Sequence, residues 1–282
     1  MNTIKTTVLL AGLGGLLVLV GSLFGTAGAV IGFGLALALV GGSYWFSDRL
    51  AITAAGAVPV TEAEMPDYYS IVRELTEAAG MPMPRLYVTP DAQPNAFATG
   101  RNPSHAAVAV TAGLLAILEP DELRGVLAHE LSHITNRDIL IGSVAAAIAT
   151  GISFVANIAL WGAAFGGGDD DRDANPFALL AAALLAPIAA GLLQMSLSRS
   201  REFEADRAGA QLAGSGEPLA RALIKLDQAA RAVPMEVQPA QASMYIVNPL
   251  TGRRIRFASL FLTHPPTEQR IDRLRQPAGA RP

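Results

Sequence analysis

The sequence predicts a mainly α-helical membrane protein, with four transmembrane helices and a cytosolic domain that contains a small antiparallel β-sheet. Three observations support this fold class. Of the 282 residues, 51% are hydrophobic and only 16% are charged, which is too apolar for a wholly soluble chain. Long stretches carry no charged residue at all. The segments between and after them show the periodicity of soluble helices and strands.

The first uncharged stretch runs from Thr6 to Ser47. Because one span needs about 20 residues, this length fits two transmembrane helices joined by a turn near Gly25–Gly28. A secretory signal peptide is an alternative, since Lys5 precedes the stretch and Ala27-Gly28-Ala29 resembles a cleavage site. The apolar stretch is longer than the usual signal-peptide core of about 7–15 residues, however. We therefore interpret residues 1–47 as a transmembrane hairpin.

The next segment, residues 48–137, has the pattern of the first part of a cytosolic domain. Apolar residues recur at helical spacing from Met65 to Ala79, and the pattern stops at Gly80. Turn residues then separate three short runs that predict a small antiparallel sheet. The sheet could be plain core, or one edge could bind a peptide as an added strand. The three runs are Arg85–Thr89, Asn95–Thr99 and Ala106–Thr111.

A helix that begins at Pro120 carries the motif His129-Glu130-Leu131-Ser132-His133. Residues four apart lie on one face of a helix, so both imidazoles can bind one metal ion with Glu130 beside them. Neutral imidazole suits Zn²⁺, and a catalytic zinc keeps one coordination position for water. Glu130 is placed to take the proton of that water as a general base. The pattern predicts a zinc site of the zincin type.

Two further uncharged stretches, Ile139–Gly168 and Ala174–Ser198, flank an acidic loop at residues 169–173. We interpret residues 138–198 as a second transmembrane hairpin. A buried hairpin of a soluble domain, or a pair of helices only partly sunk in the bilayer, are the alternatives. Four spans place the basic residues at their ends on one side of the membrane, and the positive-inside rule makes that side cytosolic. These residues are Lys5, Arg49, Arg137, Arg199 and Arg201.

This arrangement returns the chain to the same face after Ser198, where a third metal ligand could follow. Glu202 and Asp206 are four apart and share a helix face, whereas Glu204 is turned away by about 200°. If Glu202 is the ligand, Asp206 can accept a hydrogen bond from the outer nitrogen of a zinc-bound histidine. The alternative is an ordinary charged helix in which both carboxylates pair with neighbouring arginines.

Net charge and cysteine content exclude several classes of function. A net charge of −3 and the absence of any long basic run give no indication of a nucleic-acid partner. The chain has no cysteine, which excludes disulfides and thiolate metal sites. Almost no ionisable side chains occur inside the predicted spans, so a transporter is disfavoured.

Three blocks of the sequence, in this order, resemble the HtpX-like membrane zinc metalloproteases, which are relatives of the CAAX prenyl proteases. They are His129–His133 followed by Asn136-Arg137-Asp138, Ser198-Arg199 leading to Arg201–Asp206, and Thr263–Pro266 followed by Glu268, Arg270, Ile271 and Leu274. The resemblance implies that Glu202 is the third zinc ligand, with Asp206 behind the ligands. It also implies a cytosolic proteolytic site at the membrane surface and a role in membrane-protein quality control.

The resulting hypothesis is a gluzincin-type zinc endopeptidase, multi-pass in the cell inner or plasma membrane, that cleaves membrane or misfolded proteins at the cytosolic face. Residues 199–282 would form the second part of its protease domain. His264 could donate a hydrogen bond to the oxyanion, or could be a structural cap. A substrate peptide would lie along Asn95, Ala96 and Phe97. The rival hypothesis is a non-catalytic membrane scaffold or chaperone-like adaptor with a structural metal.

Overall fold

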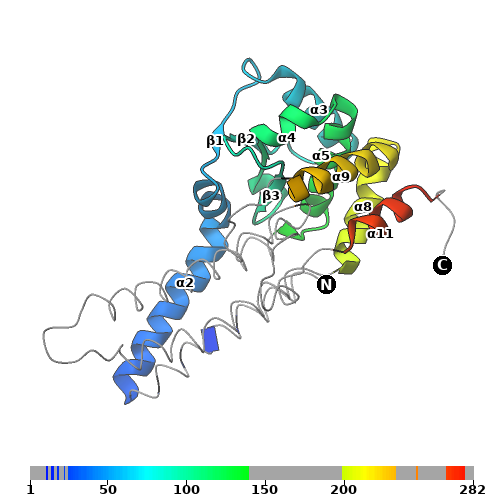
Figure 1. Cartoon of the computed structure of the whole chain (residues 1–282). Coiled ribbons are helices and arrows are strands. Elements are labelled where there is room, and N and C mark those ends of the chain that lie inside the picture. Colours follow the sequence, from blue (N-terminus) through cyan, green and yellow to red (C-terminus); the bar gives the residue numbers. More distant parts are fainter. Residues whose placement is uncertain are drawn as a thin grey trace, which may run out of the picture.

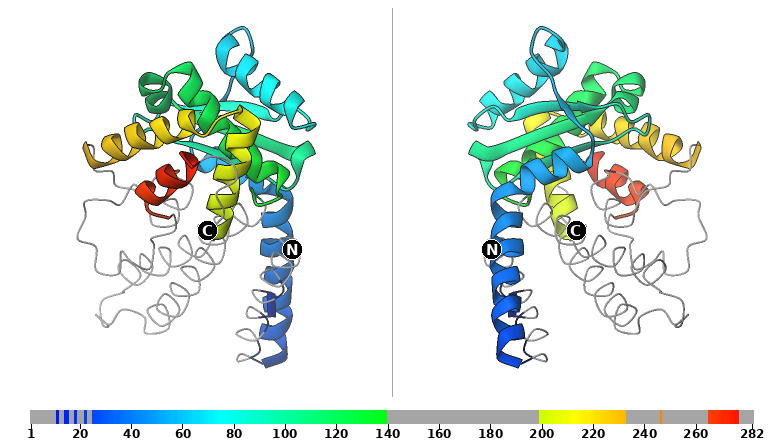
Figure 2. Two further views of the ribbon diagram at one scale, coloured as in Figure 1. Left: turned by 90° about the vertical axis from the view of Figure 1, so that its right-hand side faces the viewer. Right: turned by 90° about the vertical axis from the view of Figure 1, so that its left-hand side faces the viewer.

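The computed structural model describes residues 25–139, 199–232, 246 and 265–276, with a few positions before residue 25. These residues form a domain of helices around a small sheet, from which one long helix, α2 (Gly25–Ala54), projects (Figures 1 and 2). Most of the predicted first and third spans, the whole fourth span, the acidic loop 169–173 and His264 lie outside the described residues. Among the helices that are described, none is both long and apolar enough to cross a bilayer. The four spans therefore stay a prediction.

The sheet has four strands in the order β1-β2-β4-β3 and is mixed, so the prediction of an antiparallel sheet is wrong. β2 and β4 pair in parallel, whereas β3 pairs antiparallel with β4 and β1 pairs antiparallel with β2. The predicted strand positions agree with the structure to within one residue at each end, but the prediction missed β1. The strands are β1 (Val58–Pro59), β2 (Arg85–Thr89), β3 (Ala96–Gly100) and β4 (Ala106–Thr111).

Burial explains why β4, and not β3, takes the central position. All six residues of β4 are buried, and they are small or apolar except for Thr111. Such a strand is stabilised when it is covered on both faces and paired on both sides. The segment after β2 therefore passes the position of β4 and returns as the edge strand β3. Its turn is tied down by hydrogen bonds from Gln93 N to Asp91 Oδ1 and from Gly113 N to Asp91 O.

Helices cover one face of the sheet, and α5 (Pro120–Thr135) lies at their centre in contact with three other helices and with β3. It begins with a capping box in which Glu119 and Glu122 exchange side-chain and main-chain hydrogen bonds. Its apolar side chains enter the main core together with those of α3 and α9. The remaining helices are α3 (Pro66–Ala78), α4 (Ala112–Ile117), α8 (Arg199–Ala213), α9 (Glu217–Ala232) and α11 (Thr267–Leu274), with a 3₁₀ turn at Pro103–His105.

The other face of the sheet is covered by the last turns of α2. Ala51 and Ile52 pack there against Phe97 of β3 and against Ala107 and Ala109 of β4. We placed the start of the cytosolic domain at residue 48, but α2 continues without a break to Ala54. The projecting helix is thus fixed to the sheet by a small core of its own.

Candidate functional site

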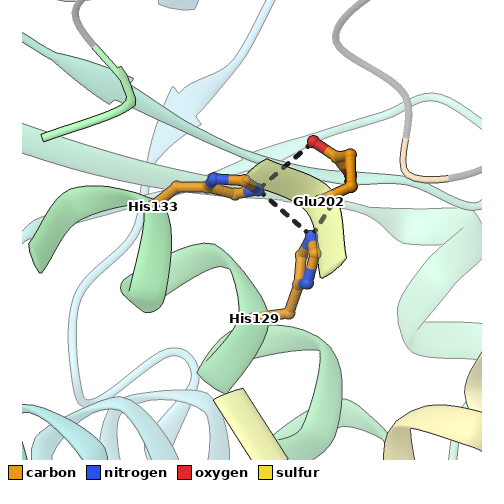
Figure 3. A group of neighbouring side chains, drawn as sticks. All are labelled: His129, His133 and Glu202. Carbon is orange, nitrogen blue, oxygen red and sulfur yellow. Dashed lines mark hydrogen bonds and ion pairs between the residues drawn. The ribbon is translucent and has the colours of Figure 1, made fainter. Parts of the chain in front are cut away.

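The two histidines of the motif point toward one another from successive turns of α5. Their Nε2 atoms lie 3.2 Å apart, and the rings meet edge to face. His129 is 2% exposed and His133 is partly buried, at the end of the helix (Figure 3). Two imidazoles with facing Nε2 atoms are typical of a shared metal ion.

Glu202 reaches the same point from the first turn of α8. One of its oxygens lies 3.8 Å from His129 Nε2 and the other lies 3.7 Å from His133 Nε2. Taking one donor atom from each residue, the three donors lie within 4.8 Å of one another (Figure 3). Two ligands at about 2.1 Å from a tetrahedral zinc are about 3.4 Å apart, so the donor set fits such an ion. Glu204 is exposed and pairs with Arg207.

A glycine permits this meeting of α5 and α8. A Cβ atom on Gly209 would lie 2.8 Å from the backbone nitrogen of His129 and 2.9 Å from its Cα. The helices therefore touch backbone to backbone at the first ligand. Gly209 is about two helical turns from Glu202 and shares its face, so this close approach sets the position of the third donor. The sequence analysis did not identify Gly209, which has no motif of its own.

Asp206 lies next to the His129 ring, on the side of Nδ1. Its Oδ1 is 2.9 Å from His129 Nδ1, which is hydrogen-bond distance, although the atoms are off the hydrogen-bond angle. Arg270 of α11 donates two hydrogen bonds to Asp206, at 2.9 and 2.7 Å, and is only 1% exposed. Burial acts to raise the pKa of Asp206, but the charge and the two hydrogen bonds of Arg270, together with the adjacent His129 ring, outweigh it and hold that pKa well below its usual range.

His133 has a carboxylate of its own, which the sequence analysis missed. Asp138 Oδ2 lies 3.6 Å from His133 Nδ1. The chain reaches this position because Arg137 adopts a left-handed conformation, with φ of 58°, directly after the helix ends. Burial acts to lower the pKa of His133, but Asp138, Glu202 and Glu130 raise it to about 9. The signal in the sequence that could have identified Asp138 is its position just past the end of the helix that carries His133.

Glu130 is buried between the histidines and the sheet. Its Oε2 accepts a hydrogen bond from the main-chain N–H of Ala98 in β3, at 2.9 Å. Burial raises the pKa of Glu130, and the neighbouring histidines and the Ala98 amide only partly oppose this rise. A carboxylate with a raised pKa close to a metal site suits a general base.

Of the three predicted substrate-binding residues, Asn95 directly precedes the edge strand, whereas Ala96 and Phe97 lie on it, and the three differ in orientation. Asn95 turns toward β4, since its N–H and C=O both bond Thr111 and its Oδ1 accepts from Ile246 N. The alternation of antiparallel pairing then directs the main chain of Ala96 and Ala98 to the outer edge. Phe97 turns its side chain into the core beneath α2.

Comparisons with known proteins identify the family of the chain. The model of peptidase family M48 matches residues 62–278. A "Protease HtpX homolog" from Pelotomaculum thermopropionicum is 52% identical over 278 residues, covering 97% of this chain and 98% of the relative. One from Syntrophobacter fumaroxidans is 52% identical over 277 residues, covering 96% and 98%. The crystal structure of S. mikatae Ste24p aligns with a TM-score of 0.46 at 19% identity, covering 86% of this chain and 64% of that one.

The match to the family begins shortly after β1 and continues past the end of α11, and the relatives match over nearly the whole chain. The chain belongs to peptidase family M48 and is a metalloprotease.

Proposed function

We propose that the protein is a membrane zinc endopeptidase in which His129, His133 and Glu202 hold the metal and Glu130 is the general base. The observation that carries this proposal is the convergence of three donor atoms from two helices, on two buried residues and one partly buried residue, with Glu130 beside them and bonded to the edge strand. Imidazole and carboxylate together are a zinc donor set.

The number of donors favours catalysis over a structural metal. Within the described ranges, the group that could hold an ion contains three residues. A structural zinc usually takes four protein ligands, whereas three ligands leave one tetrahedral position for water or substrate. The scaffold hypothesis gives no role to Glu130, the carboxylate beside these three donors.

The chemistry follows from the side chains around the metal. When bound, zinc supplies Lewis acidity, which makes a water more acidic and polarises the scissile carbonyl. Glu130 accepts a proton from the attacking water and passes it to the leaving amine. Asp206 and Asp138 orient the rings of His129 and His133 from behind. His264 is our predicted hydrogen-bond donor to the oxyanion.

The polypeptide substrate would lie extended against β3, which is an edge strand. Of the predicted run Asn95–Phe97, Ala96 offers its main chain to such a peptide. At Ala98 the N–H is bonded to Glu130, so the proposed general base would lie directly beside the bound peptide. The scissile bond would therefore lie opposite Ala98.

The cellular role in this proposal is the cleavage of membrane or misfolded proteins at the cytosolic face of the cell membrane, as part of protein quality control. The resemblance to HtpX-like proteases supports it, as do the relatives with that name. The exposed apolar side chains of α2, which include Val30, Ile31 and Phe33, support a membrane location.

The test combines metal content with proteolysis on detergent-purified protein. We expect about one zinc per chain and chelator-sensitive casein cleavage in wild type, and normal zinc without turnover in Glu130→Gln. Glu202→Ala should lose the metal, whereas the matched control Glu204→Ala, on the exposed side of the same helix, should keep both properties. A full zinc content in Glu202→Ala would mean that the third ligand is a residue other than Glu202. Bound zinc without cleavage in wild type would favour the scaffold.

A further inference from the structure

The edge strand β3, which the proposed function offers to a peptide, is paired along one side only in the described sheet, to β4. Such a strand has fewer main-chain hydrogen bonds than a central one, so contacts at its ends and faces must keep it in place. Its start is tied by Asn95, whose main chain bonds Thr111. Its middle is tied by Ala98, whose N–H bonds Glu130. The last residues of β3 require a further anchor.

That anchor comes from α2, because Arg101, directly after β3, contacts a residue 56 positions earlier. The Arg101 guanidinium lies 4.7 Å from the centre of the Trp45 ring and donates a hydrogen bond to Trp45 O at 3.2 Å. Gly100 has φ of 137°, and a Cβ atom there would lie 2.2 Å from the carbonyl oxygen of His105, so the turn is tight. Arg101 therefore cannot shift independently of β3. We call the pair Trp45 and Arg101 the latch.

The helix at the other side of the latch is itself fixed to the sheet, so it can serve as a support. Asp48 of α2 is 8% exposed and forms an ion pair with Arg85 of β2. Ala51 and Ile52 pack against Phe97 from beneath β3. The end of α2 thus lies against the sheet (Figure 2). A strand end tied to this helix is tied to the body of the domain.

We propose that Trp45 and Arg101 are positioning residues for the substrate, because the latch keeps the outer edge of β3 where a peptide can pair with it. The inference rests on the proposed function and adds a role for α2 inside the protease itself. This role does not depend on where α2 lies relative to a membrane.

Loss of the latch should weaken substrate binding more than it slows the chemical step. Without it the end of β3 moves away for part of the time, while the three metal ligands stay on α5 and α8. The apparent affinity of a site then falls in proportion to the fraction of molecules that are competent to bind. A peptide that has bound pairs with β3 and restores its position. The loss therefore appears in KM and spares kcat.

Steady-state kinetics on detergent-purified, full-length protein tests this split, with an internally quenched peptide of casein sequence as the probe. Trp45→Ala and Arg101→Ala should each raise KM about threefold to tenfold, with kcat within about twofold of wild type and full zinc content. The double variant should be no worse than either single variant, because both remove one contact. Trp45→Phe keeps an aromatic ring and the main-chain acceptor, so its KM should stay within about twofold of wild type.

The matched controls come from a second arginine–aromatic pair that lies wholly within α2. Arg49 lies 5.9 Å from the centre of the Phe46 ring, and both residues are exposed. Phe46→Ala and Arg49→Ala remove the same kinds of side chain beside the latch and should leave KM unchanged. Unchanged KM in both latch variants, an equal rise in the control pair, or additive effects in the double variant would overturn the inference and leave the proposed function intact. Failure of wild type to cleave the peptide would instead overturn the proposed function.

Hydrogen exchange followed by mass spectrometry tests the latch without any turnover. Arg101→Ala should speed exchange in the segment Ala96–Gly100, while the amides of α5 keep their protection. Arg49→Ala should change neither segment. Equal protection of β3 in wild type and in Arg101→Ala would contradict the latch, whether or not the protein cleaves the probe peptide.

Discussion

Replacing Gly209 with alanine should damage the metal site without touching any ligand. The added Cβ would lie 2.8 Å from His129 N and 2.9 Å from His129 Cα, both backbone atoms of α5 that cannot rotate away. Ordinary contact begins near 3.4 Å. The helix α8 must therefore move away from α5 by about 0.6 Å, carrying Glu202 and Asp206 with it.

That displacement is large for a metal site. Ligand distances are held to about ±0.2 Å, and a misplacement near 1 Å can cost about 100-fold in function. We therefore expect Gly209→Ala to bind zinc about 10- to 100-fold more weakly than wild type. The overpacking should also lower the free energy of unfolding by about 1–3 kcal/mol.

A competition titration with a chromophoric chelator measures the affinity, and thermal unfolding measures the stability. The matched control is Gly34→Ala, also inside a helix, where a Cβ would meet nothing within 4 Å. It should leave the zinc affinity unchanged and stabilise the helix by about 0.5–1 kcal/mol. A zinc affinity for Gly209→Ala within twofold of wild type would refute the reasoning.

Three further predictions concern the surroundings of the metal. Arg137 has a left-handed backbone, with φ of 58°, so Arg137→Gly should be neutral or stabilising, whereas Arg137→Val should lower the free energy of unfolding by about 1–2 kcal/mol. Thermal unfolding measures both variants, and equal effects would contradict the need for a left-handed residue at this position. The proton that His133 holds below pH 9 in the metal-free site must leave when zinc binds, so affinity should rise about tenfold per pH unit from pH 7 toward 9 and then level off. Calorimetry in two buffers should find about one proton released per zinc at pH 7.5, and a flat affinity across this range would contradict the raised pKa. Arg270→Met should destabilise by about 3–5 kcal/mol in denaturant unfolding, because it leaves Asp206 charged and buried. Adding Asp206→Asn should recover part of that loss, and no recovery would mean that the arginine acts elsewhere.

The sequence predicted most of the helices and strands because their signals are local. The periodic apolar residues and the proline at the start predicted the helix α5, with both histidines on one face. The spacing of Glu202 and Asp206 predicted that they share a face of their helix, and this is the face of α8 that meets α5. The partners Asp138 and Arg270 were harder to find, because each depends on where a chain end or a distant helix lies in space. Gly209 depends on a backbone contact between α5 and α8, which no local pattern encodes.

The order of strands was also beyond a local reading, and the difference bears on function. Three consecutive strands joined as an antiparallel meander would place the middle one, Ala96–Gly100, between its neighbours with both sides paired. This strand would then have no free edge for a peptide, and the Ala98 amide would be used inside the sheet. Because β4 pairs in parallel with β2, β3 is displaced to the edge and turns that amide to Glu130. The mixed topology thus brings the peptide edge and the proposed general base together, which a hairpin repeat could not do.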